Sequence, residues 1–253
     1  MKTIAVSMQK GGVGKTTLAY HLAFGLAKQN ESVLLVDLDP QANLSATVGI
    51  TSCDAMRIFD PQPTLQWKYV CNGNDGKIGI IGAGQELMKV SGNSSLSIYT
   101  KLRRALQSGG NGSWNYVIID CPPNLGVLTI NALVASDFVL VPVLPSYYCM
   151  TGLKSLIESI EDVKSSNINP SLKLLAIVMN QTTATNVARE AEEVLSKEFS
   201  NVFLPSRIPR SIKVEEALQA RKPVWEYARE SRCAMEFSNV ISEIYTRLKT
   251  ETF

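Results

Sequence analysis

The feature that most constrains the fold of this chain is a glycine-rich segment at residues 10–17, with the sequence KGGVGKTT. It follows an apolar run over residues 3–8 and precedes a helical pattern over residues 18–28. A loop that joins a strand to a helix N-terminus can cradle a phosphate, because backbone N–H groups and the helix dipole attract anions there. Glycines let the backbone approach the ligand closely. The segment therefore predicts a phosphate-binding loop in an α/β protein.

This loop departs from the usual pattern G-x-x-x-x-G-K-[ST] in two ways. Gln9 stands where the first glycine is expected, and a second lysine, Lys10, precedes Lys15 by five residues. With Gly14, Lys15 and Thr16 in the ordinary positions, Lys10 has no evident role at the phosphates of its own subunit. We expect the whole segment to contact the nucleotide: Lys10, Gly11, Gly12, Val13, Gly14, Lys15, Thr16 and Thr17.

Two further motifs place carboxylates at the ends of apolar runs. Residues 32–36 lead into DLDPQAN at residues 37–43, which contains Asp37 and Asp39, and residues 115–119 lead into Asp120. Continuous apolar runs are typical of strands buried in a parallel sheet, and ligands bind at the carboxyl ends of such strands. In P-loop NTPases an aspartate at this position holds Mg²⁺ together with the loop hydroxyl, which is that of Thr16 here.

Together the three motifs resemble the ParA/MinD family of P-loop ATPases, whose Walker A box is deviant, and most closely its ParA/Soj-type partition ATPases. The resemblance covers nearly the whole chain outside residues 50–76, a variable stretch to which we assign no function. It implies an ATPase with slow basal turnover that uses ATP and Mg²⁺. It also implies that Lys10 reaches across a nucleotide-sandwich dimer to the phosphates of the partner.

The resemblance assigns roles to further residues. Asp37 would contact the magnesium shell, which gives Thr16, Asp37 and Asp120 as the metal set, and Asp39 would position or activate the attacking water. The resulting catalytic set is Lys10, Lys15 and Asp39. Asn180 and the backbone around Pro209 and Arg210 would flank the adenine, and residues 121–126 resemble the second switch. Many relatives carry a glutamate before the Gly-Leu pair, where this chain has Met150-Thr151-Gly152-Leu153, a departure at the expected dimer face.

The pattern of apolar runs predicts one α/β domain over residues 1–253. We expect a mostly parallel sheet of about seven or eight strands, each followed by a helix, with helices on both faces. The expected strands are residues 3–8, 32–36, 65–71, 78–81, 115–120, 138–143, 172–179 and 202–205.

Composition excludes several classes of protein. The five cysteines are scattered and form no C-x-x-C pair, which argues against a disulfide framework, a zinc ribbon and an iron–sulfur carrier. His21 is the only histidine, so a histidine-based metal site or catalytic dyad is excluded. No signal-peptide pattern and no apolar run of roughly 18 residues is present, and we expect a cytoplasmic protein. The resemblance to partition ATPases implies that it is associated with the nucleoid.

A local basic region is the candidate for nucleic-acid binding, because a net charge of +2 is too small to indicate it globally. Residues 205–232 contain seven Arg or Lys and four Glu, and a dimer doubles this patch. Such a patch predicts binding to DNA that is independent of sequence and sensitive to salt. By resemblance to partition ATPases, the candidate DNA contacts are Lys197, Lys213, Arg221 and Lys222.

The motifs leave three functions to compare. The first is an ATP-dependent dimer that binds DNA without sequence specificity and segregates a plasmid or chromosome, until a ParB-like centromere-binding or cargo adaptor protein stimulates hydrolysis. Positioning of a protein cargo fits the same motifs. A MinD-like cycle on membranes requires a C-terminal amphipathic helix with a cationic face. The apolar stripe over residues 237–248 lies opposite mixed charges, so we expect that helix to pack on the sheet and expect no membrane partner.

Overall fold

The computed structural model describes residues 1–253 except 74–75, 93–94, 109–113, 147–148 and 252–253. One seven-stranded sheet organises it, in the order β3-β4-β2-β5-β1-β6-β7. The strands are β1 (Lys2–Val6), β2 (Ser32–Asp37), β3 (Lys68–Gly73), β4 (Gly76–Ile81), β5 (Tyr116–Asp120), β6 (Phe138–Val143) and β7 (Lys173–Met179). All neighbours pair in parallel except β3 and β4. The predicted mostly parallel sheet is confirmed.

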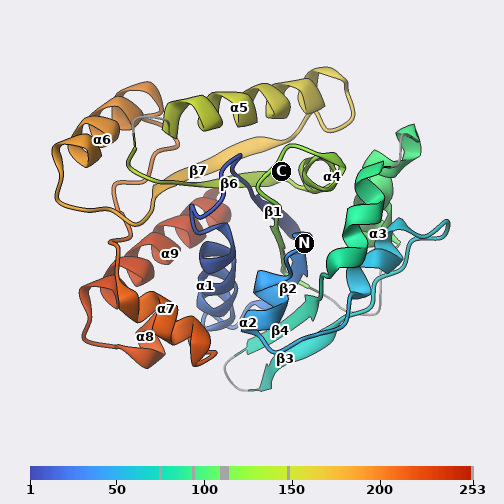
Figure 1. Cartoon of the computed structure of the whole chain (residues 1–253), viewed down its shortest axis with the longest axis horizontal. Coiled ribbons are helices and arrows are strands. Elements are labelled where there is room, and N and C mark those ends of the chain that lie inside the picture. The colour runs from blue at the N-terminus through green and yellow to red at the C-terminus, as the bar shows by residue number, and fades with distance from the viewer. Residues whose placement is uncertain (74–75, 93–94, 109–113, 147–148, 252–253) are drawn as a thin grey trace.

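Helices cover both faces of the sheet, as Figure 1 shows for α5 and α6 on one side of β7 and α1 and α9 on the other. The α-helices are α1 (Lys15–Ala27), α2 (Asn43–Thr47), α3 (Lys101–Gln107), α4 (Val127–Ala135), α5 (Cys149–Ser165), α6 (Asn186–Glu198), α7 (Ile212–Gln219), α8 (Val224–Tyr227) and α9 (Arg232–Thr250). Three 3₁₀ segments are η1 (Asp54–Phe59), η2 (Gln85–Gly92) and η3 (Leu96–Thr100).

The continuous apolar runs have a simple explanation in two cores, one on each face of the sheet. In β1, Ile4 and Val6 pack in the core beneath α1 and α9, while Ala5 packs in the core beneath α4 and α5. Successive side chains of a strand point to opposite faces. A strand covered on both sides therefore has no solvent-exposed side and does not alternate between apolar and polar residues. This burial fixes the central strands that carry the loops described below.

Two details of the predicted strand pattern are wrong. β3 is not followed by a helix, because it turns directly into β4 as an antiparallel hairpin at the edge of the sheet. Residues 202–205 form only an isolated parallel bridge between Phe203 and Ile177. Pro205 ends this stretch two residues after Phe203, and proline has no N–H with which to continue a ladder.

The C-terminal helix α9 packs on the sheet, as expected. Phe237, Val240, Ile244 and Leu248 are fully buried, and they join the core that α1 also covers. Among the described residues, no helix combines the length and apolar character needed to span a bilayer. The apolar stripe is therefore used for internal packing.

Candidate active site

The loop between β1 and α1 adopts the backbone conformation that its glycines permit. Gly14 is the N-cap of α1 with φ 86°, and Gly12 has φ 73°. These left-handed values are disfavoured for residues with a side chain. The carbonyl of Gly14 accepts the first helical hydrogen bond from the N–H of Leu18 at 2.9 Å. The loop thus delivers Lys15 and Thr16 at the first turn of the helix.

Two amides that follow β7 hold this loop in place. The Nδ2 of Asn180 donates to the carbonyl of Val13 at 2.7 Å, and the Nε2 of Gln181 donates to the carbonyl of Gly12 at 2.8 Å. Asn180 is buried, and an added Cβ on Gly14 would lie 2.1 Å from its Nδ2. Asn180 thus supports the loop as well as bordering the cleft beside it. Sequence reasoning missed Gln181, although a polar pair directly after a buried strand is a detectable signal.

The two lysines of the loop lie in different surroundings. Lys15 is 7% exposed, and its Nζ donates to the carbonyl of Lys10 at 3.0 Å. Burial lowers the pKa of Lys15, and the carboxylates of Asp120 and Asp39 oppose that shift. Lys10 is half-buried, and its Nζ lies 3.5 Å from the Oγ of Ser146, a residue after β6 that sequence reasoning missed.

Thr16 and Asp120 meet at the carboxyl end of the sheet. The hydroxyl of Thr16 donates to Oδ2 of Asp120 at 2.6 Å, while the buried Oδ1 of Asp120 has no hydrogen-bond partner among the described residues. Burial and the nearby Asp37 carboxylate raise the pKa of Asp120. A buried carboxylate with one oxygen to spare, next to a hydroxyl, fits Mg²⁺, which binds through one or two carboxylates plus substrate phosphates. In the described part of the chain, no group of three or more His, Cys, Asp or Glu side chains is placed to hold a metal ion.

Asp37 is the direct neighbour of Asp120 in the sheet, because the two residues are register partners on the adjacent strands β2 and β5. Its Oδ1 accepts from the N–H of Asp39 at 3.1 Å, and its Oδ2 accepts from the N–H and the hydroxyl of Ser45 at 2.9 and 2.7 Å. Burial raises the pKa of Asp37 to about 6 in spite of these bonds. The predicted metal-shell residue is therefore also an anchor for α2. Nothing in the sequence indicated that Ser45, eight residues after Asp37, would bind its carboxylate.

Asp39 lies in the turn that follows β2. It is 8% exposed, and its Oδ1 accepts from the N–H of Gln41 at 2.9 Å. Ala42, the N-cap of α2, has φ 54°, a left-handed conformation that is unusual for alanine. Such strained backbone tends to occur in segments that change conformation. The structure brings Lys15, Thr16, Asp37, Asp39 and Asp120 to one end of the sheet.

A cleft beside the loop contains the residues predicted to flank adenine. Its lining includes Thr17, Asn180, Pro209 and Arg210. The segment with Pro209 is held against the end of β7 by a parallel bridge to Thr182, and the N–H of Arg210 donates to the Thr182 carbonyl at 3.0 Å. Residues far apart in sequence thus form one cleft that continues from the phosphate-binding loop.

The candidate DNA contacts do not all lie on one element. Lys213 is on α7, where its Nζ pairs with Glu216 at 2.8 Å, and Arg221 and Lys222 form the exposed turn before α8. The guanidinium of Arg221 covers Gly49, at which an added Cβ would come within 2.5 Å of it. Lys197 is exposed near the end of α6, on a different helix.

Comparison with protein families and curated proteins identifies relatives over almost the whole length. Residues 1–174 match the family model described as an AAA domain. The chain is 34% identical over 252 residues to the sporulation initiation inhibitor protein Soj of Bacillus subtilis, covering 96% of this chain and 98% of that protein. It is also 34% identical to the chromosome partitioning protein ParA of Caulobacter vibrioides, with coverage of 98% and 95%.

Solved structures agree with this assignment. Cobyrinic acid a,c-diamide synthase from Mycobacterium smegmatis, with bound ADP and magnesium, superimposes with a TM-score of 0.79 at 27% identity, covering 99% of this chain and 96% of that one. The ATP complex of an McdA variant from Cyanothece has a TM-score of 0.85 with coverage of 100% and 98%, and at 20% identity it shows the shared fold. The glycine-rich loop, the aspartates at the sheet end and the full-length similarity agree, and the chain belongs to the ParA/Soj family of P-loop partition ATPases.

Proposed function

We propose that this protein is an ATP-dependent dimerising switch, which binds DNA without sequence specificity in its ATP state and positions or segregates a plasmid or chromosome. The observation that carries the proposal is the loop with two lysines beside the Thr16–Asp120 pair. Full-length similarity to Soj and ParA, which are named for sporulation control and chromosome partitioning, supports the same role. In this role the protein acts in the cytoplasm, on the nucleoid.

The residues at the sheet end divide the work of ATP hydrolysis. Lys15 places an ammonium group in the phosphate-binding loop, where it neutralises phosphate charge. Thr16 and Asp120 would hold Mg²⁺, with Asp37 beside them, and the ion would screen the negative charge that develops on the phosphates. Asp39 is in reach of this end of the sheet and is proposed to orient the attacking water and accept its proton. Asn180, Pro209 and Arg210 bind the adenine end.

Lys10 is proposed to act across the dimer. Its Nζ lies near Ser146, and its carbonyl, not its ammonium group, is what Lys15 contacts in this chain. A cation that is not engaged with its own subunit's loop is available to the phosphates of a partner. In the ATP-bound dimer, the Lys10 side chain of each subunit would contact the phosphates bound by the other, and hydrolysis would weaken these contacts.

Release from DNA is proposed to depend on a second protein, of the ParB-like centromere-binding or cargo adaptor type, which stimulates hydrolysis. The segment that would respond includes Asp39 and α2, because Asp37 ties α2 to the nucleotide site through Ser45. The strained Ala42 lies between them. A partner that shifts this segment would move Asp39 relative to the phosphates.

The test is binding to random-sequence duplex DNA with ATP, ADP or no nucleotide, at several salt concentrations, with Asp39→Ala used to hold the ATP state. We expect binding only with ATP, and a steep loss of affinity as salt rises. Lys222→Ala should weaken binding and reduce the salt slope by about one. Lys154→Ala, an exposed lysine on α5, is the matched control. Absence of DNA binding in every nucleotide state would overturn the proposal.

A further inference from the structure

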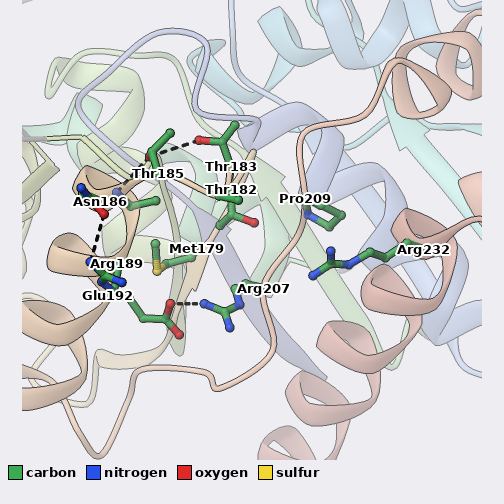
Figure 2. Close-up of a pocket in the computed structure, with 12 residues that line it drawn as sticks. Met179, Thr182, Thr183, Thr185, Asn186, Arg189, Glu192, Arg207, Pro209 and Arg232 are labelled. Atoms are coloured by element: carbon green, nitrogen blue, oxygen red, sulfur yellow. Dashed lines mark hydrogen bonds and ion pairs between the residues drawn. The ribbon is translucent and has the colours of Figure 1, made fainter.

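A second cavity lies outside the nucleotide cleft, with a volume of about 490 Å³. It is formed by the end of β7 with the N-terminal part of α6, by the segment before α7 and by the first residue of α9 (Figure 2). Its polar lining includes Thr183, Thr185, Arg189, Glu192, Arg207 and Arg232. Cavities of roughly 300–1,000 Å³ have the size that binds small molecules.

Three arginines from three separate segments line this cavity. Arg189 belongs to α6, Arg207 precedes α7, and Arg232 begins α9. Figure 2 shows Arg232 extending from α9 toward the side where Arg207 and Pro209 lie. Opposite charges attract, so three guanidinium groups in the lining of one cavity favour an anion as its ligand.

The compensation present in the chain is incomplete. Arg207 pairs with the carboxylate of Glu192, and the Nη2 of Arg189 donates to the Oδ1 of Asn186 at 2.9 Å. Arg232 is 3.9 Å from Glu236 at its nearest approach, and its side chain is 74% exposed. Among the described lining residues, Glu192 is the single carboxylate beside three guanidinium groups, and Glu236, which is not part of the lining, pairs with Arg232.

The rest of the lining suits a phosphate. The hydroxyls of Thr183 and Thr185 lie 3.5 Å apart at the N-terminus of α6, where the helix dipole also favours an anion. Met179, Ala188 and Pro209 supply apolar surface. The planar guanidinium forks match the geometry of phosphate oxygens better than an ammonium group does.

The cavity adjoins the ATP cleft at Pro209, which lines both. Its arginines are not part of the cleft, which is lined by Thr17, Asn180 and Arg210 among others. We propose that this cavity, lined by Arg189, Arg207 and Arg232, is a second phosphate-binding site, independent of the P-loop. The phosphate belongs either to a free nucleotide-sized ligand or to the backbone of DNA, and the chemistry of recognition is the same for both.

Glu192 competes with the ligand in this arrangement. In the absence of an anion its carboxylate neutralises Arg207. A bound phosphate must share or displace that contact, at an electrostatic cost from the nearby negative charge. Removing the charge of Glu192 is therefore expected to strengthen phosphate binding, an outcome that damage to the fold would not produce.

The experiment follows the side-chain Nε–Hε resonances of Arg207 and Arg232 by NMR while inorganic phosphate is added. The P-loop is first saturated with ADP and Mg²⁺, and a titration with sodium chloride of equal ionic strength serves as the reference. We expect a saturable shift of both resonances with phosphate. Arg232→Ala should weaken binding roughly tenfold, and Glu192→Gln should strengthen it several-fold. Arg104→Ala, an exposed arginine on α3, should leave binding unchanged.

Two further titrations identify the source of the phosphate. A short DNA duplex is added to Asp39→Ala saturated with ATP and Mg²⁺, the state expected on DNA, and adenosine monophosphate is added to the ADP-bound protein. Saturation by adenosine monophosphate with no response of Arg207 and Arg232 to the duplex assigns a free ligand, while a stronger response to the duplex assigns the DNA backbone. Equal responses to phosphate and chloride, or unchanged affinity in Glu192→Gln, would overturn the inference. Because the titration with inorganic phosphate uses the ADP-bound protein, a state that the proposed function expects to be off DNA, phosphate binding here and ATP-dependent DNA binding can fail separately.

Discussion

At Gly14 the backbone is left-handed, with φ 86°, and an added Cβ would lie 2.1 Å from Nδ2 of Asn180. We expect Gly14→Ala to lower the free energy of unfolding of the nucleotide-free protein by about 1–3 kcal/mol, because it combines backbone strain with a clash. Gly11→Ala is the control, since an added Cβ there meets nothing within 4 Å among the described residues. Denaturant unfolding measures both variants, and an equal loss in both would contradict the role of the Asn180 contact.

His21 connects the helix that follows the phosphate-binding loop to α8. It is fully buried, its Nδ1–H donates to the carbonyl of Thr17 at 2.7 Å, and its Nε2 accepts from the N–H of Val224 at 3.1 Å. The ring stacks on Phe237 with a centroid distance of 4.2 Å. The acceptor role of Nε2 requires a neutral ring, so His21 occupies one tautomer in the folded state.

This neutral ring makes the stability of the protein dependent on pH. Burial lowers the pKa of His21 from 6.5 to about 4. Between about pH 6.5 and pH 4, His21 is therefore protonated in the unfolded chain and neutral in the folded chain. The free energy of unfolding should fall as pH drops through this range, by up to ~3 kcal/mol from this group. Unfolding free energies at pH 7 and pH 4.5 would test this against His21→Gln. Because the chain has one histidine, an unchanged pH slope in that variant would contradict the assignment.

The packing of α1 on α9 is closest at Gly25. An added Cβ at Gly25 would lie 2.4 Å from Cγ2 of Ile241. We expect Gly25→Ala to destabilise the protein by about 1–2 kcal/mol, although alanine is the better helix former, because overpacking outweighs helix propensity in a tight interface. A double-mutant cycle with Ile241→Ala measures the coupling between residues 25 and 241. Additive effects on the free energy of unfolding would show that the loss in Gly25→Ala does not come from a clash with Ile241.

Elements with strong local patterns were predictable from the sequence. The buried strands were predicted from continuous apolar runs, and the phosphate-binding loop was predicted from the spacing of its glycines and lysine. β3 was misjudged because antiparallel pairing depends on which edge is free, and residues 202–205 were misjudged because Pro205 stops pairing that the apolar run favours. Ser45 and Gln181 were missed because their roles arise from contacts between separate loops.

The cavity with Arg207 and Arg232 could not be predicted from the sequence, because it depends on contacts between separate segments. Arg207 and Arg232 belong to the local excess of charge over residues 205–232, but the candidate DNA contacts are Lys197 and three other members of that excess. Nothing in the order of residues indicates that Arg189 of α6 lines the same cavity as Arg232 of α9. Convergence of charges from separate elements is a property of tertiary structure alone.

At the scale of the whole molecule, the proposed assembly depends on the second lysine of the loop, Lys10. We expect Lys10→Ala to bind ATP but to remain monomeric with it, because the phosphates would lose the cation supplied by the partner. Lys15→Ala, in contrast, should lose productive ATP binding altogether. Nucleotide-binding measurements separate the two variants, and sedimentation with and without ATP reports their assembly. Full ATP-dependent dimerisation by Lys10→Ala would exclude a role for Lys10 between subunits.

The amides of Asn180 and Gln181 hold a loop that is synthesised about 170 residues earlier, since their partners are the carbonyls of Val13 and Gly12. β1 is also flanked by β5 and β6, both of which appear long after it. A nascent chain that ends before β7 therefore carries the glycine-rich motif without its supports. We expect ribosome-bound chains to retain ATP only once residue 181 has left the exit tunnel, so nucleotide capture occurs late in synthesis and not at its beginning.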